Sequence, residues 1–197
     1  MGWRDRPAED QGPPRACSSR TSLKRSIRET VFLVALALVL SQAVKAYAVQ
    51  PYVVPSGSML PTIQLWDRVL AEKVTYRFVR EPEVGDIVVF DNPDPTNKRE
   101  KIYIKRVIAV AGQSVDVRDG IVWVDGVALS EPYTHGVSTD PGSVSLPATV
   151  PEGHVWLMGD NRPGSGDSRF FGPQPVSHVR GRAVLTYWPP TRFGELD

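Results

Sequence analysis

The chain has 197 residues, of which 41% are hydrophobic, 23% charged and 9% aromatic, with 16 glycines and 18 prolines. This composition is too apolar for a disordered chain and too rich in helix-breaking residues for a helical bundle. The net charge of +1 argues against a nucleic-acid partner, because it gives no overall basic field. A single cysteine excludes an intrachain disulfide framework, and with only three histidines we expect no metal and no cofactor.

The N-terminal segment is basic: seven basic and four acidic side chains leave a net charge of +3 over residues 1–29. Its Pro, Gly and Ser content predicts a disordered tail. Residues 30–49 follow, with Lys45 as their only charged residue. About 20 helical residues cross a hydrocarbon core of about 30 Å, so this segment predicts one transmembrane helix. The basic residues before it predict a cytoplasmic N-terminus, with the remainder on the outer side of the cell membrane.

A cleavable signal peptide is the alternative for this region. Residues 31–40 would form its apolar core, and Ala46-Tyr47-Ala48 fits the small-x-small cleavage pattern. A buried core helix is a further alternative. We favour a retained anchor because the segment 51–58, which carries the candidate chemistry, begins directly after the apolar run.

Short strand patterns separated by turn residues make up most of the chain after Val49. They lie at 51–54, 67–71, 86–90, 102–110, 114–117, 121–124, 154–158 and 181–187. Asp119-Gly120 and Asp125-Gly126 are tight-turn dipeptides, which predict consecutive hairpins over 114–129. We therefore expect an all-β fold, a folded or barrel-like antiparallel sheet with a small β-hairpin subdomain.

This organisation predicts a division of the chain into successive parts. They are a basic tail (1–29), a transmembrane helix (30–49), a catalytic β domain (50–113 and 152–190), an inserted β-hairpin subdomain (114–151) and a C-terminal tail (191–197).

The first candidate chemical group is the segment 55–62, in which two prolines bracket Ser56, Gly57 and Ser58. Stiff flanks and a permissive glycine suit a side chain that must be presented outward. A serine-rich turn is the alternative reading. A serine hydroxyl is also a poor nucleophile until a base takes its proton, so a base must be found.

No histidine stands in a pattern that supports a Ser-His-Asp triad, since His135, His154 and His178 all lie in or beside loops. Lys105 is the stronger candidate because it interrupts the apolar strand pattern 102–110. The ordinary pKa of lysine is about 10.4, and burial lowers it, which makes a neutral amine available as a general base. An edge-strand lysine that deters aggregation is the alternative. Lys73 has an acidic neighbour and fits a solvated strand end.

A third cluster, residues 158–172, places charged and hydroxyl side chains between glycines. It is either a solvated loop or a set of groups that orient a catalytic amine.

Together these segments resemble bacterial type I signal peptidases, the membrane-anchored serine proteases of the leader peptidase family that use a Ser-Lys dyad. The resemblance rests on Pro55-Ser-Gly-Ser-Met-Leu-Pro-Thr62, Gly85-Asp-Ile-Val-Val89, Tyr103-Ile-Lys-Arg-Val107 and Gly159-Asp-Asn-Arg-x3-Ser-x-Asp-Ser-Arg169, in this order. It extends from the apolar segment to about Tyr187.

The resemblance implies that Ser58 is the nucleophile and Lys105 the general base. The backbone N–H of Ser58 and the hydroxyl of Ser56 would form the oxyanion hole. The supporting residues that it implies are Ser165, which would orient the lysine amine, the ion pair of Asp167 with Arg169, and the ion pair of Asp160 with Arg106.

The implied substrates are secretory preproteins, cut after small residues in an Ala-x-Ala pattern by a monomeric enzyme that contacts membrane lipid. The chain departs from the family pattern in having one anchor segment and in carrying Pro163 and Gly164 where a more polar pair is usual. The resemblance transfers no role to the insert 114–151.

Two other functions remain open from the sequence. A self-cleaving Ser-Lys regulator or a specialised plasmid-transfer peptidase would share the dyad, and incubation with an Ala-x-Ala preprotein separates these from a signal peptidase. A catalytically silent β domain that binds secretion components would not be labelled at Ser58 by a serine-directed acylating probe.

Overall fold

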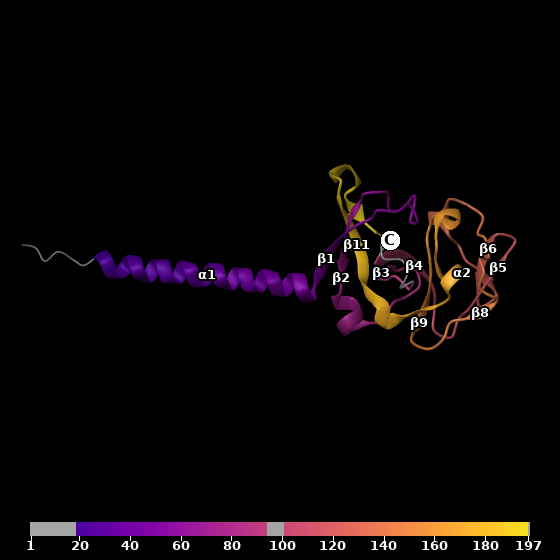
Figure 1. The fold of residues 1–197 in the computed structure, drawn as a ribbon, viewed down its shortest axis with the longest axis horizontal. Helices are drawn as coiled ribbons and strands as arrows, with labels where there is room; N and C mark the ends of the chain where they lie inside the picture. Colours follow the sequence, from indigo (N-terminus) through magenta and orange to yellow (C-terminus); the bar gives the residue numbers. More distant parts are fainter. Residues whose placement is uncertain (1–18, 94–100, 197) are drawn as a thin grey trace, which may run out of the picture. The chain divides into compact units, whose positions relative to one another are not determined.

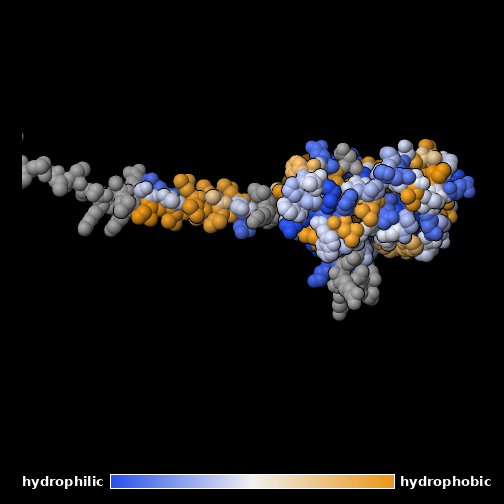
Figure 2. Space-filling model, turned by 90° about the horizontal axis from the view of Figure 1, so that it is seen from above, coloured by the Kyte–Doolittle hydropathy of each residue, from blue (hydrophilic) through white to orange (hydrophobic). Residues whose placement is uncertain are grey.

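The computed structural model describes residues 19–93 and 101–196. The chain divides into two units, residues 1–42 and 43–197. The first unit contains most of helix α1, Ser19–Tyr47 (Figure 1). Its large apolar side chains between residues 31 and 40 are all exposed, and Figure 2 shows them along the helix. None of the described helices is both long enough and apolar enough to cross a membrane.

The start of α1 differs from the disordered tail predicted for residues 1–29. Residues 1–18 of that tail lie outside the described residues, whereas the helix already begins at Ser19. The reason is local: no proline lies between Pro14 and Pro51, and Arg, Lys and Leu, which recur from residue 20 onward, favour helix.

The second unit is built on a curled antiparallel sheet of eight strands in the order β1-β2-β11-β3-β4-β9-β10, with β12 paired to β11 (Figure 1). The strands are β1 Val49–Val53, β2 Arg68–Glu72, β3 Ile87–Asp91, β4 Ile102–Val110, β9 His154–Met158, β10 Gln174–Pro175, β11 Val179–Trp188 and β12 Gly194–Glu195. Short apolar runs between turn residues account for the longer of these strands, and the prediction of a mostly β, antiparallel fold is confirmed.

A smaller four-stranded sheet, in the order β7-β6-β5-β8, is formed by the insert. Its strands are β5 Ser114–Arg118, β6 Ile121–Val124, β7 Val127–Ala128 and β8 Ala148–Thr149. The two Asp-Gly turns join β5 to β6 and β6 to β7, and all four turn residues have positive φ, as tight hairpins require.

Short helical turns connect the strands. They are η1 Thr75–Val79, η2 Pro132–Thr134, η3 Arg162–Gly164, α2 Ser168–Phe171, η4 Val176–His178 and η5 Pro190–Arg192.

Two apolar clusters position the site. One lies under β1, β2 and the segment after β1, and it includes the fully buried Met59 and Ile63. The other joins the two sheets, because Ile108 and Trp156 of the larger sheet pack with Val115 and Val122 of the smaller one. The insert is therefore held against β4, which carries Lys105, and against β9, which leads into residues 158–172.

The C-terminal residues are part of the fold and not the tail predicted for 191–197. β12 pairs with β11 through Gly194↔Thr186 and Glu195↔Leu185. Leu196 is buried in the cluster that contains Met59. A strand of two residues has no alternation to recognise, which is why the sequence pattern does not reveal it.

Candidate active site

Ser58 lies in a tight loop between β1 and β2. The loop is closed by backbone hydrogen bonds from Val54 N to Asp67 O (2.9 Å) and from Trp66 N to Val54 O (2.7 Å). Met59, the next residue, is completely buried and fixes the loop to the core. Ser58 therefore faces away from that core while remaining 8% exposed.

Lys105 comes from the middle of β4 and meets Ser58. Its amine donates hydrogen bonds to Ser58 Oγ at 2.6 Å and to the carbonyl oxygen of Ile104 at 3.1 Å. The lysine is 3% exposed. Burial removes water from the amine and disfavours its charged form. The structure thus brings together the two residues that the sequence proposes as nucleophile and base.

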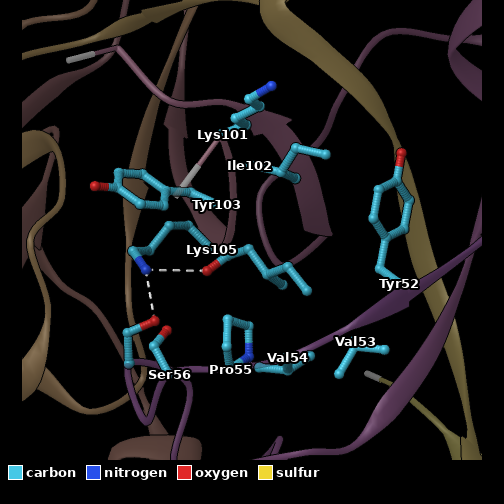
Figure 3. Close-up of a pocket in the computed structure, with 11 residues that line it drawn as sticks. Tyr52, Val53, Val54, Pro55, Ser56, Lys101, Ile102, Tyr103 and Lys105 are labelled. Carbon is cyan, nitrogen blue, oxygen red and sulfur yellow. Dashed lines mark hydrogen bonds between the residues drawn. The ribbon is translucent and has the colours of Figure 1, made fainter. Parts of the chain in front are cut away.

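A cleft of about 330 Å³ opens beside this pair. Figure 3 shows its two walls: Tyr52 to Ser56 on one side and Lys101 to Lys105 on the other. Ser56, the proposed oxyanion donor, lines the cleft together with Ser58. Burial raises the pKa of Tyr52, with the nearby Arg180 acting in the opposite direction, so this wall presents a neutral phenol.

Arg106 and Asp160 form the first supporting ion pair. The guanidinium of Arg106 donates to the carboxylate through Nε (3.0 Å) and through a terminal nitrogen (2.9 Å), and both side chains are buried. Thr62, which lies in the same loop as Ser58, donates its hydroxyl to Asp160 at 2.5 Å. The ion pair is the one that the resemblance implies, and through Thr62 it connects β4 to the Ser58 loop.

Asp167 and Arg169 form the second ion pair. Arg169 Nε lies 2.8 Å from Asp167 Oδ1, and the backbone N–H of Gly159 donates to the other oxygen at 3.0 Å. Ser165 lies between Gly159 and Asp167 in sequence and is buried. Its hydroxyl makes no hydrogen bond with any described residue, so the predicted bond to the lysine amine is not formed. The amine donates to Ser58 and Ile104 instead.

The alternative bases lie elsewhere. Neither Lys73 nor any of the three histidines lines the cleft. His135 and His178 are exposed, and His154 contacts the carbonyl of Glu152. Within the described part of the chain, no cluster of three or more His, Cys, Asp or Glu residues could hold a metal ion.

Asn161 and Glu131 belong to the site but have no signal of their own in the sequence. Asn161 donates from its backbone to Ser58 O at 3.1 Å and from its amide to Gly57 O at 2.9 Å. Glu131 binds Arg162, 31 residues further along the chain. Asn161 falls within the motif 159–169, whereas Glu131 lies outside every motif. A contact between residues that lie 31 positions apart leaves no local pattern in the sequence.

Comparison with known proteins places the chain in a family. Residues 27–188 match the family described as signal peptidase, peptidase S26. A probable signal peptidase I-1 of Synechocystis sp. is 41% identical over 175 residues, covering 86% of the chain and 87% of that protein. Thylakoidal processing peptidase 1 of Arabidopsis thaliana is 40% identical over 74% of the chain, which spans 44% of that protein. A solved signal peptidase I from Enterococcus faecalis has 33% identity, a TM-score of 0.43, and coverage of 52% of this chain and 97% of its own.

The chain belongs to the signal peptidase family, peptidase S26. This confirms the resemblance found in the sequence. The chain is accordingly a serine endopeptidase, and its substrates are preproteins that carry signal peptides.

Proposed function

We propose that Ser58 is the nucleophile and Lys105 the general base of this peptidase. The observation that carries the assignment is the 2.6 Å contact between Lys105 Nζ and Ser58 Oγ, made by two buried side chains beside a cleft. Arg106, the neighbouring cation, is always protonated and engaged with Asp160, so it is no competitor for the role of base.

The reaction proceeds by acyl transfer. A neutral Lys105 amine takes the Ser58 proton as Oγ attacks the scissile carbonyl carbon. The resulting ammonium returns a proton to the leaving nitrogen, the C–N bond breaks, and the acyl group remains on Ser58. Water then attacks the ester with the same amine as base, which releases the new carboxylate and restores the serine.

The developing oxyanion needs hydrogen-bond donors on the cleft side of Ser58. The hydroxyl of Ser56 and the backbone N–H of Ser58 are suited to this role because both residues line the cleft. Removal of one such donor typically lowers kcat by about 10²–10³-fold.

The substrate binds as an extended strand between β1 and the start of β4. β1 is the first strand of the described sheet order, and it lines the cleft together with the start of β4. A peptide can lie extended between these two walls and place alternate side chains in the cleft. Val54, Pro55 and Ile104 line it closely, which favours small residues such as Ala-x-Ala before the cut.

The supporting residues act by holding these groups in place. Arg106 and Asp160 connect β4 to the Ser58 loop through Thr62. Asp167 and Arg169 shape the loop that contains Ser165, whose buried hydroxyl would orient the amine once a substrate has engaged Ser58.

The apolar segment 30–49, which extends beyond the described side chains of α1, anchors the enzyme in the cell membrane by a single pass. This gives a cytoplasmic N-terminus and an extracytoplasmic catalytic domain that works as a monomer. This part of the proposal is supported by the exposed apolar side chains from Val31 to Leu40 (Figure 2) and by the basic residues before them.

The dyad is tested with a model preprotein that carries an Ala-x-Ala site. We expect the wild type to release a product whose N-terminus follows the second alanine. Ser58→Ala and Lys105→Ala should each abolish this cleavage, because one lacks the nucleophile and the other the base. Product is measured by N-terminal sequencing and by the rate of its appearance.

Lys73→Ala is the matched control, because this lysine follows β2 outside the cleft and should leave the rate unchanged. Near-wild-type cleavage by a folded Lys105→Ala enzyme would refute the mechanism. Cleavage at another sequence would overturn the proposed specificity while leaving the dyad intact.

A further inference from the structure

The insert contacts residues 159–169, here called the catalytic loop, through the carboxylate of Glu131, whose side chain is 9% exposed. Both of its oxygens bind the guanidinium of Arg162, at 2.8 Å and 2.5 Å. Tyr133 donates its hydroxyl to the same carboxylate at 3.0 Å, and burial together with this carboxylate raises the pKa of Tyr133, which keeps it a donor. Arg162 is only 1% exposed. A guanidinium this deeply buried is tolerated because its donors are matched by acceptors.

Arg162 also fixes the backbone of the catalytic loop. Its Nε donates to the carbonyl oxygen of Gly159 at 3.0 Å, and a terminal nitrogen reaches the hydroxyl of Thr139 at 2.8 Å. Tyr133 adds a second contact, since the Arg106 guanidinium lies over its ring at 4.1 Å from the centroid. The insert thus contacts both Arg162 and the Arg106–Asp160 pair.

The far end of the catalytic loop is held by the insert as well. The carbonyl oxygen of Arg169 accepts backbone hydrogen bonds from Ser143 and Val144, each 3.0 Å long. Gly142 lies against the same carbonyl, where an added Cβ would overlap the backbone. The loop from Gly159 to Arg169 is therefore fixed at both ends by residues of the insert.

The loop in turn determines where Ser58 lies. Asn161, between Gly159 and Arg162, donates its two hydrogen bonds to the carbonyl oxygens of Ser58 and Gly57. A displacement of Arg162 would move Asn161 and with it the backbone of the nucleophile. Acyl transfer is sensitive to such shifts, since a misplacement of about 1 Å can cost about 10²-fold in rate.

We propose that Glu131 is a positioning residue for the peptidase reaction, acting through Arg162 and Asn161 on Ser58. On this proposal the insert has a role in catalysis, because its contacts hold the backbone of Ser58 in place. The inference rests on the proposed function of Ser58 and Lys105, because it concerns the geometry of that dyad.

The test is Glu131→Gln, which keeps the shape of the side chain but removes its charge and one acceptor. We expect kcat on the model preprotein to fall by about 10²-fold with KM unchanged, since the cleft itself is intact. The rate of Ser58 labelling by a serine-directed acylating probe should fall in parallel. The final extent of labelling counts the folded sites, so kcat is expressed per folded site.

A double variant separates positioning from simple destabilisation. If Glu131 acts through Arg162, Glu131→Gln combined with Arg162→Gln should lower kcat no further than Arg162→Gln alone. Tyr133→Phe, which removes one hydrogen bond to Glu131 and keeps the ring over Arg106, should give a smaller loss than Glu131→Gln.

Asp125→Asn is the matched control within the insert. This carboxylate accepts from Ser114 N at 2.7 Å and from Gln113 at 3.1 Å, and neither residue belongs to the catalytic loop. It should lower the melting temperature without changing kcat per folded site. An unchanged kcat per folded site in Glu131→Gln would overturn the inference, as would additive effects in the double variant. The proposed function fails separately, if Ser58→Ala remains active.

Discussion

At the scale of the residue, Gly159 packs against both Ser165 and the backbone of Ser58. Its N–H donates to Asp167 at 3.0 Å and its carbonyl accepts from Arg162 at 3.0 Å. A Cβ at this position would overlap both the Ser165 hydroxyl and the carbonyl oxygen of Ser58. Close packing is therefore the reason that glycine is required here. Backbone conformation is not the reason, because the φ of Gly159 lies outside the left-handed region.

Gly159→Ala should consequently displace the Ser58 backbone. We expect kcat to fall by about 10²-fold or more, with the fold retained, because the displaced backbone carries Ser58, the proposed nucleophile. The measurement is kcat on a peptide with an Ala-x-Ala site, together with circular dichroism of the variant.

Gly166→Ala is the control for this substitution. It lies in the same loop, but an added Cβ would meet no atom within 4 Å. Its kcat should match that of the wild type. Equal losses in both variants would mean that general loop rigidity, and not the contact at Gly159, limits the reaction.

At the scale of the element, Asp86 connects the start of β3 to two other segments. Its carboxylate accepts from Arg80 at 2.7 and 3.0 Å and from the Tyr76 hydroxyl of η1 at 2.8 Å. Arg182 of β11 lies 3.0 Å away on the other side. Burial alone would raise the pKa of Asp86, but the hydrogen bonds from Arg80, from the backbone of Glu83 and from Tyr76 outweigh it and hold that pKa below its ordinary value.

A lowered pKa in the folded state makes the stability of the protein depend on pH. The unfolded chain binds a proton at Asp86 more readily than the folded one. The stabilisation is therefore complete above the ordinary pKa of about 4 and is lost as the pH falls through the folded value. Asp86→Asn should lower the free energy of unfolding by about 2 kcal/mol at neutral pH, and less at acid pH. Urea unfolding across this range measures the difference.

Asp116→Asn is the comparison for Asp86. Asp116 pairs with Arg118 at 2.6 Å, but the arginine side chain is 56% exposed. Its loss should cost well under about 1 kcal/mol, because water screens the pair. A pH-independent effect of Asp86→Asn would contradict the role assigned to the lowered pKa.

The strands are the part that the sequence predicts well, and the structure also brings Ser58 and Lys105 into contact. Strand patterns at 102–110 and 154–158 coincide with β4 and β9, because a short, largely apolar run bounded by turn residues is typical of a strand buried on both faces. Alternation fails within β4, where the register shifts between Val107 and Ala109, so these two residues lie in different apolar clusters. Local patterns indicate both residues: Lys105 interrupts an apolar strand pattern, and Ser58 lies in a segment bracketed by two prolines.

Contacts between distant segments are the part that the sequence does not predict. The Glu131–Arg162 pair depends on how the insert packs against β4 and β9, which no local pattern encodes. The same applies to β12, whose two residues pair only because η5 turns the chain back onto β11.

At the scale of the whole molecule, the chain joins a helix with an exposed apolar surface to a β domain with buried charges. Val31 to Leu40 offers no polar side chain, and its large residues are exposed along α1. In water such a surface would be unfavourable, at about 25 cal/mol per Å² of apolar area. The β domain, by contrast, keeps Asp160, Arg162 and Arg169 paired in its interior.

The proposed membrane anchoring by α1 leads to a prediction for the full chain mixed with lipid vesicles. The wild type should float with the vesicles and resist alkaline extraction. Leu36→Arg with Val39→Arg should shift the protein to the soluble fraction, since each charge at the bilayer centre costs about 3 kcal/mol. Leu36→Ala with Val39→Ala is the control and should stay with the lipid. Both variants should still cleave a soluble Ala-x-Ala peptide, because the dyad lies wholly in the β domain. Vesicle association that survives the two arginines would locate the lipid contact outside α1.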